Sequence, residues 1–171
     1  MAKLEIVVAP DPVLKKKARP VDRVDGDTAR LMDDMLETMY AAPGIGLAAP
    51  QVGVLRRILV VDVAPKDQPA EPIRMANPEI LWQSDDLQVQ EEGCLSLPDQ
   101  FADVIRPAAV RVRYLDETGT RREIEATGLL ATCIQHEIDH LDGVLFTDHI
   151  SLLKRNIIMR KLVKWKKAKA A

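Results

Sequence analysis

Apolar positions recur along this chain with two periods, one typical of helices and one typical of strands. Between residues 25 and 41 they return every three or four positions, which predicts an amphipathic helix. Asp25 or Asp27 is available as its N-cap, and Pro43 and Gly44 follow its end. This segment is therefore expected to bury one face against the rest of the molecule.

Runs rich in β-branched residues, or with strict alternation, predict the strands. They lie at residues 56–63, 73–82, 87–90, 110–115 and 121–126, with a turn at 116–119 before the last. A second helix is predicted at residues 129–141, with Thr127 as a plausible N-cap and Gly143 beyond its end. A third is expected after Ser151, with an apolar stripe formed by Leu153, Ile157, Ile158, Leu162 and Trp165.

The order of these elements favours an α+β fold, because the helices separate runs of strands instead of alternating with them. We expect mostly antiparallel sheets packed around the helix at residues 129–141, with an N-terminal helix and a basic C-terminal helix. The length of 171 residues suits a single domain over residues 1–171.

Composition limits the cellular setting. The chain is 47% apolar and 29% charged, as is ordinary for a soluble globular protein. No apolar run approaches the roughly 20 residues of a membrane span. The apolar stretch at the N-terminus is too short for a secretory signal. We therefore expect a cytoplasmic protein without a membrane partner, in which Cys94 and Cys133 stay reduced.

Charge is distributed unevenly along the chain. Residues 150–171 contain eight Lys or Arg residues and no acid, so against a total of −2 they leave −10 on residues 1–149. This basic tail is consistent with an anionic partner such as nucleic acid. A solvated basic face on a terminal helix is an equally good interpretation.

The most specific chemical signal is an H-E-x-x-H run within the second predicted helix. His136 and His140 are four residues apart, so on a helix they share a face and can bind one metal ion. Glu137 lies beside this pair and can take a proton from water during metal-assisted hydrolysis. Buried histidines are often structural, but apolar neighbours would make an unpaired polar cluster costly here, which favours a metal site.

A tight catalytic site usually has three protein ligands, so a third is needed. The acids nearest after His140 are Asp142 and Asp148, and no Glu follows it. Cys94 is the better candidate, because Gly93 before it allows the backbone to approach an ion closely. The alternative is that Cys94 is simply a small buried side chain.

A third segment, residues 43–53, is rich in small residues. It lacks the third Gly of a dinucleotide-binding loop and the Lys of a phosphate-binding loop. Its small side chains instead suit a wall along which an extended peptide could pair. Gln51 would add a polar amide to that wall, or it is an ordinary turn residue.

Three motifs in this order, residues 44–51, 92–96 and 135–140, resemble the signature motifs of the bacterial peptide deformylase family. The resemblance extends over nearly the whole chain. It implies removal of the formyl group from the N-terminal formyl-methionine of newly synthesised polypeptides, with release of formate. The metal ligands would be Cys94, His136 and His140, holding Fe²⁺, with Ni²⁺, Co²⁺ or Zn²⁺ able to take its place.

Further roles follow from the same resemblance. Glu137 would act as general base, and the Gln51 side chain with the Leu95 backbone N–H would stabilise the oxyanion. The substrate would bind against six residues: Gly44, Ile45, Gly46, Leu129, Thr132 and Cys133.

Outside the ligands, we predict that Glu92 pairs with Arg106 and orients the loop of Cys94. We also predict that Asp139 or a backbone carbonyl accepts a hydrogen bond from a ligand imidazole.

The resemblance also suggests a partner for the basic tail, because the C-terminal helix of some family members docks on the ribosome. No DNA partner is expected. Two other classes stay open from the residues alone: a zinc endopeptidase using the same H-E-x-x-H helix, and a noncatalytic RNA-binding module relying on the tail.

Overall fold

The computed structural model describes residues 2–170 and has an antiparallel five-stranded sheet, a two-stranded sheet and three α-helices. The large sheet has the order β1-β2-β3-β6-β7, and β4 pairs with β5 in the small sheet. The strands are β1 (Gly46–Ala48), β2 (Ile58–Val61), β3 (Ile73–Gln83), β4 (Leu87–Cys94), β5 (Leu97–Pro107), β6 (Ala109–Leu115) and β7 (Arg121–Thr127). The helices are α1 (Gly26–Ala41), α2 (Gly128–Leu141) and α3 (Leu152–Ala170). The predicted α+β fold is confirmed.

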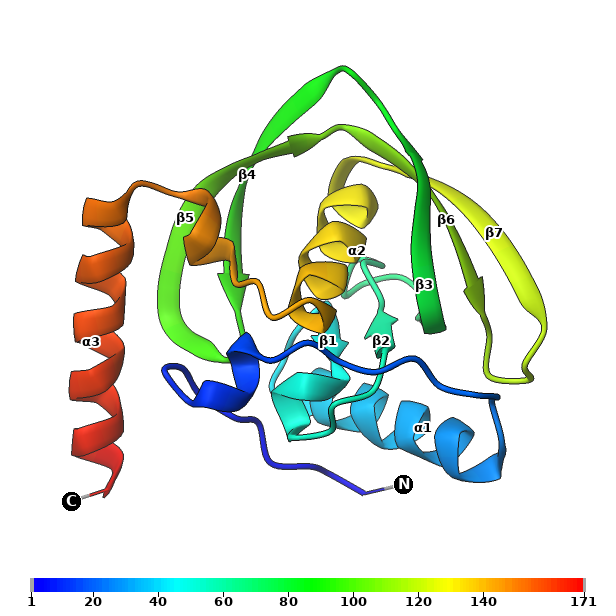
Figure 1. Cartoon of the computed structure of the whole chain (residues 1–171), viewed down its shortest axis with the longest axis horizontal. Helices are drawn as coiled ribbons and strands as arrows, with labels where there is room; N and C mark the ends of the chain where they lie inside the picture. Colours follow the sequence, from blue (N-terminus) through cyan, green and yellow to red (C-terminus); the bar gives the residue numbers. More distant parts are fainter. Residues whose placement is uncertain (1, 171) are drawn as a thin grey trace.

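Helix α2 occupies the centre of the molecule, with β4 and β5 on one side and β3, β6 and β7 on the other (Figure 1). Helix α1 lies below β1 and β2, and α3 lies at the edge nearest β5. Because α2 is enclosed in this way, most of its polar side chains are buried, among them His136, Glu137 and His140.

The short strand β2 packs against α1 with one face and against α2 with the other. Ile58 and Val60 belong to the core shared with α1, whereas Leu59 and Val61 belong to the core shared with α2. All four side chains are completely buried. A strand covered on both faces needs a continuous apolar run, and the sequence of β2 provides one.

Capping interactions determine where two helices begin. Of the two candidate caps for α1, Asp25 fulfils the role, because its carboxylate accepts from the Thr28 N–H at 2.8 Å. Thr127 precedes α2 as predicted, but its side chain makes no capping hydrogen bond. Gly128 has φ +57°, a conformation that favours glycine, so the backbone turn begins this helix without a side-chain cap.

Two strands were missed by the pattern of the sequence. β1 has only three residues, and β5 carries Pro, Asp, Gln and Arg that obscure any alternation. β5 becomes a strand because it pairs with β4 from Leu87–Pro107 to Cys94–Leu97. This pairing also extends β4 beyond the predicted residues 87–90 and places Cys94 at its end.

The apolar stripe predicted for α3 is only partly correct. Ile158 and Leu162 are buried in a third core cluster with Leu14 and Phe146, but Leu153 is 69% exposed. Only one narrow side of α3 therefore rests on the molecule. Within the described residues, no helix is both long and apolar enough to cross a membrane.

Candidate metal centre and active site

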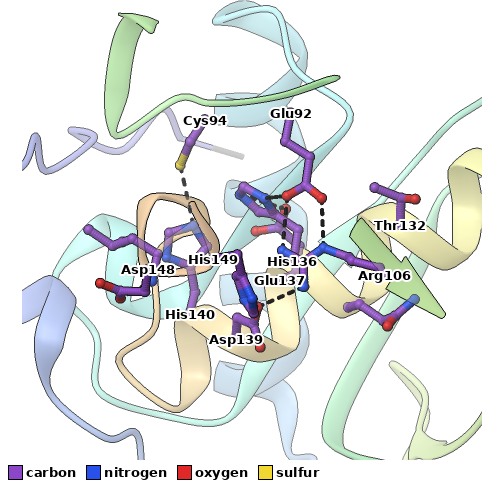
Figure 2. Close-up of polar contacts among 12 residues, drawn as sticks. Glu92, Cys94, Arg106, Thr132, His136, Glu137, Asp139, His140, Asp148 and His149 are labelled. Carbon is purple, nitrogen blue, oxygen red and sulfur yellow. Dashed lines mark hydrogen bonds and ion pairs between the residues drawn. The ribbon is translucent and has the colours of Figure 1, made fainter. Parts of the chain in front are cut away.

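Cys94, His136 and His140 come together although they lie on separate elements. The two histidines are one turn apart on α2, and Cys94 reaches them from the end of β4 (Figure 2). The Cys94 Sγ atom is 3.3 Å from His140 Nε2, and one donor atom from each residue lies within 4.8 Å of the others. Tetrahedral ligands at Zn–S and Zn–N bond lengths would be about 3.6 Å apart, so the spacing fits a metal ion.

Glu92 orients one of the two imidazoles. Its Oε1 is 2.8 Å from His136 Nδ1, so it can accept the proton on that nitrogen and leave Nε2 free as a ligand. Arg106 donates to both oxygens of Glu92, at 2.6 Å from Nε and 2.9 Å from Nη2. The predicted Glu92–Arg106 pair is thus present in the structure, and both side chains are buried.

The charge of Glu92 is stabilised against its burial. Burial alone would raise the pKa of Glu92, but the hydrogen bonds from Arg106 and His136 outweigh it and lower the pKa to about 2. A buried acid that loses such a partner is left with an uncompensated charge, which is strongly destabilising.

The contact predicted for Asp139 is wrong. Its Oδ2 accepts from Arg106 Nη1 at 2.8 Å and lies 2.8 Å from His149 Nε2, so it contacts neither candidate ligand histidine through a hydrogen bond. Asp139 is next to His140 in sequence, but adjacent helix residues point in different directions. The carboxylate that contacts the imidazole of a candidate ligand is instead that of Glu92, on β4. His140 Nδ1 has no hydrogen-bond partner among the described residues, so no backbone carbonyl fulfils the alternative there.

Glu137 lies deep beside the same pair of histidines. It is 4% exposed, and its Oε2 is 4.0 Å from His136 Nε2. Burial raises the pKa of Glu137 to about 7. A carboxyl group with a pKa near neutrality can both take up and release a proton at physiological pH. Its position is compatible with a general base next to the metal.

Gln51 presents its amide nitrogen to the same site. Its Oε1 accepts from the Ala48 N–H at 2.9 Å, which fixes the orientation of the amide. The Nε2 atom lies 3.4 Å from Cys94 Sγ and 3.1 Å from Ser96 Oγ. Ser96 is completely buried, and its role as a partner of Gln51 was not anticipated from the sequence. Its place in the Cys94 motif was the only available signal.

A cavity of about 720 Å³ opens beside these groups. The six predicted substrate-binding residues all line it, together with Cys94, Leu95, Gln51, His136 and Glu137. Leu129 and Ile45 are 44% and 43% exposed and lie at its mouth, whereas Thr132 and Cys133 are buried inside. Gln88 Nε2 donates to Thr132 Oγ1 at 2.9 Å, so the hydroxyl is already engaged.

Two features of the cavity wall suit a peptide substrate. β1 is at the edge of the large sheet and, among the described residues, pairs with β2 alone, so its second edge can take another strand. Gly46 brings the wall very close to two buried side chains of α2: a Cβ added there would be 2.5 Å from Glu137 Oε2 and 2.8 Å from Cys133 Sγ.

The α+β fold, the H-E-x-x-H helix and the cysteine beside both imidazoles define a metal-dependent hydrolase with a cavity large enough for an amino-acid side chain. Residues 3–156 match the family described as Polypeptide deformylase. The chain belongs to this family.

Individual relatives agree with the family match. Peptide deformylase of Agrobacterium fabrum is 55% identical over 164 residues, covering 96% of each chain. That of Methylocella silvestris is 60% identical over 162 residues, covering 93% of this chain and 83% of the relative. Among solved structures, peptide deformylase from Ehrlichia chaffeensis superposes with a TM-score of 0.94 at 40% identity, covering 99% of this chain and 100% of the other.

A second structure from that organism contains actinonin. It superposes with a TM-score of 0.92 at 42% identity, covering 96% of this chain and 98% of the other.

Proposed function

We propose that this protein hydrolyses the formamide bond of N-formyl-methionyl peptides of nascent chains, with Cys94, His136 and His140 holding the metal. The observation that carries this assignment is the position of Glu137, buried between the candidate ligands and the Gly46 wall of the cavity. When bound, the ion supplies Lewis acidity, which acidifies water and polarises a carbonyl oxygen.

Glu137 moves the proton in this reaction. Its carboxylate takes a proton from the water that adds to the formyl carbon. It then gives the proton to the peptide nitrogen as the C–N bond breaks. The products are formate and a peptide with a free amino group. A single group can do both because burial brings its pKa to about 7.

The oxyanion of the tetrahedral intermediate is stabilised by the Gln51 amide and the Leu95 backbone N–H. Support for Gln51 comes from its fixed orientation, with Oε1 on the Ala48 N–H and Nε2 toward Cys94. Removing one donor of this kind typically lowers the rate by about 10²- to 10³-fold.

The methionine side chain occupies the apolar part of the cavity, beside Leu129, Thr132 and Cys133. Burial raises the pKa of the Cys133 thiol far above its ordinary value, so it stays protonated and serves as a packing surface. The peptide backbone pairs with residues 44–46 at the free edge of β1.

The decisive experiment combines anaerobic purification, metal analysis and formate release from formyl-Met-Ala. We expect Fe²⁺ in the native protein, with Ni²⁺, Co²⁺ or Zn²⁺ able to replace it, because one thiolate and two imidazoles suit all four ions. Glu137→Gln should keep the metal and lose nearly all formate release. Glu125→Gln, on the surface strand β7, is the matched control and should behave as wild type.

The same assay separates the deformylase from a zinc endopeptidase. Cleavage of internal peptide bonds without formate release would contradict the proposed reaction. Equal formate release by Glu137→Gln and wild type would contradict the role of this carboxylate.

We also propose that α3 brings the enzyme to the ribosome in the cytoplasm. One side of α3 is fixed by Ile158 and Leu162, which leaves Lys154, Lys161 and Lys164 exposed to an anionic partner. Phosphate contacts of this kind weaken steeply with salt.

Exchanging Lys161 and Lys164 for Gln tests the α3 proposal without removing the buried side of the helix. If both contact phosphate, the slope of log affinity against log salt should decrease by about 2 in ribosome co-sedimentation. Lys66→Gln, in an exposed loop, is the control. Unchanged co-sedimentation of the double variant would contradict the proposal.

A further inference from the structure

A chain of hydrogen bonds leads from the surface residue His149 to the candidate ligand His136. His149 Nε2 lies 2.8 Å from Asp139 Oδ2, and the same oxygen accepts from Arg106 Nη1 at 2.8 Å. Arg106 in turn holds Glu92, which meets His136 Nδ1 (Figure 2). Every link is between 2.6 and 2.9 Å, so the series is continuous.

The inner part of this series is buried and therefore sensitive to orientation. Arg106 and Glu92 are 5% and 4% exposed, and their paired charges have little water to replace a lost contact. Asp139 is the outermost acid that touches Arg106. Arg106 and His149 both contact the Oδ2 atom of Asp139, so His149 contributes to the position of this oxygen.

The main chain at His149 is held independently of its imidazole. His149 ends the 3₁₀ turn Phe146–His149, and Asp148 accepts from the Leu145 N–H at 3.0 Å and pairs with Lys15 and Arg155. A change of the imidazole alone therefore leaves this turn in place.

We infer that His149 is a positioning residue for the metal centre, acting on His136 through Asp139, Arg106 and Glu92. Its contribution is an N–H donor at the Nε2 position, which keeps Asp139 aligned with Arg106. This inference rests on the proposed metal centre and concerns how firmly that centre holds its ion. His149 is not among the residues that line the cavity, and its described side-chain hydrogen bond goes to Asp139 and not to a candidate ligand.

The donor position provides a sharp test. The side-chain amide of Gln reaches about as far as Nε2 of His, whereas that of Asn is one methylene shorter. His149→Gln should therefore preserve the contact with Asp139, and His149→Asn should lose it although both introduce the same amide. Asp148→Asn is the control for the turn itself, because it weakens the contacts to Lys15 and Arg155 and leaves the series of hydrogen bonds intact.

The measurement is the affinity of each purified protein for Co²⁺. Competition with a chelator is followed through the thiolate-to-cobalt absorption, and thermal unfolding is recorded without metal. Direct outer partners of metal ligands typically change affinity by about 10- to 100-fold. His149 acts through three intervening residues, so we expect His149→Asn to bind Co²⁺ about 3- to 10-fold more weakly. His149→Gln and Asp148→Asn should match wild type.

Each outcome decides one question. Equal Co²⁺ affinity of His149→Asn and wild type would overturn the inference while leaving the metal centre standing. Equally weak Co²⁺ binding by His149→Asn and His149→Gln, together with lower stability of both metal-free proteins, would show that His149 has a merely structural role. That result would also overturn the inference. Absence of cobalt–thiolate absorption in wild type would overturn the proposed centre itself, and the inference with it.

Discussion

The close approach of Gly46 to Glu137 allows a single methyl group to displace the proposed base. A Cβ built on Gly46 would lie 2.5 Å from Glu137 Oε2, 2.9 Å from Glu137 Cδ and 2.8 Å from Cys133 Sγ. Ordinary contact begins near 3.4 Å, so Gly46→Ala forces a separation of about 0.9 Å between the strand and the carboxylate. Glu137 and Cys133 are both buried and both line the cavity, so a displacement moves them away from their positions beside the candidate ligands.

The displacement has two expected consequences. Overpacking of a buried site typically costs about 1–3 kcal/mol in the free energy of unfolding. A misplacement of about 1 Å can lower the rate of an oriented reaction by about 10²-fold. We therefore expect Gly46→Ala to lower kcat for formate release from formyl-Met-Ala by about 100-fold. Metal content should stay near that of wild type, since the three atoms nearest to the added methyl group belong to Glu137 and Cys133 and to none of the candidate ligands.

The assay requires kcat, KM, metal content and thermal unfolding measured on the same preparation. Gly26→Ala is the matched control: its Cβ meets only Arg30 at 3.5 Å, at the start of α1 and outside the cavity. It should retain the activity of wild type. The reasoning is refuted if folded, metal-loaded Gly46→Ala has a kcat within about twofold of wild type, because the carboxylate would then tolerate the displacement.

Three further predictions concern stability. In urea unfolding, Leu162→Ala should lower the free energy of unfolding by about 2–5 kcal/mol and Leu153→Ala by no more than about 0.5 kcal/mol, because of these two residues only Leu162 is buried. Similar losses in the two variants would contradict the assignment of the Leu162 side of α3 to the core. Hydrogen bonds from Arg122 and the 118–120 turn lower the pKa of Asp116, so its contribution is present above the unfolded pKa of about 3.9 and declines below it. Asp116→Asn should cost about 1 kcal/mol at pH 7 and less at pH 3, and an equal cost at both would contradict this. Burial and the hydrogen bond to Asp62 raise the pKa of Tyr40 to about 12. The contribution of the Tyr40 hydroxyl to stability is complete below pH 10 and is lost as the pH rises through 12. The decrease in the free energy of unfolding between pH 10 and 12 should therefore be smaller for Tyr40→Phe than for wild type.

Local sequence patterns were sufficient for several elements. The helical period of residues 25–41 and the H-E-x-x-H spacing depend only on neighbours within one turn, so α1 and the shared face of His136 and His140 could be predicted. The candidate for a third ligand was also accessible, because Cys94 follows a glycine within a recognisable motif, and the structure places it beside both histidines. The family match over residues 3–156 agrees with the resemblance that the three sequence motifs indicated.

Other features depend on contacts between distant segments. β5 carries no clear alternation and becomes a strand only by pairing with β4. The side of α3 that packs is decided by Leu14 and Phe146, which are remote in sequence from much of that helix. Sequence periodicity therefore predicted the helix and two of its buried residues, Ile158 and Leu162, but it also assigned the exposed Leu153 to the apolar stripe.

The sequence alone determined which residues have the chemistry of a metal-dependent hydrolase and which two lie one helical turn apart. Tertiary structure decided what surrounds them. It brought Glu92, and not Asp139, to the imidazole of the candidate ligand His136, and it placed the Gly46 backbone against Glu137. The physical reason is that spacing along one helix fixes local geometry, whereas the partners of a buried charge come from whichever strands fold over it.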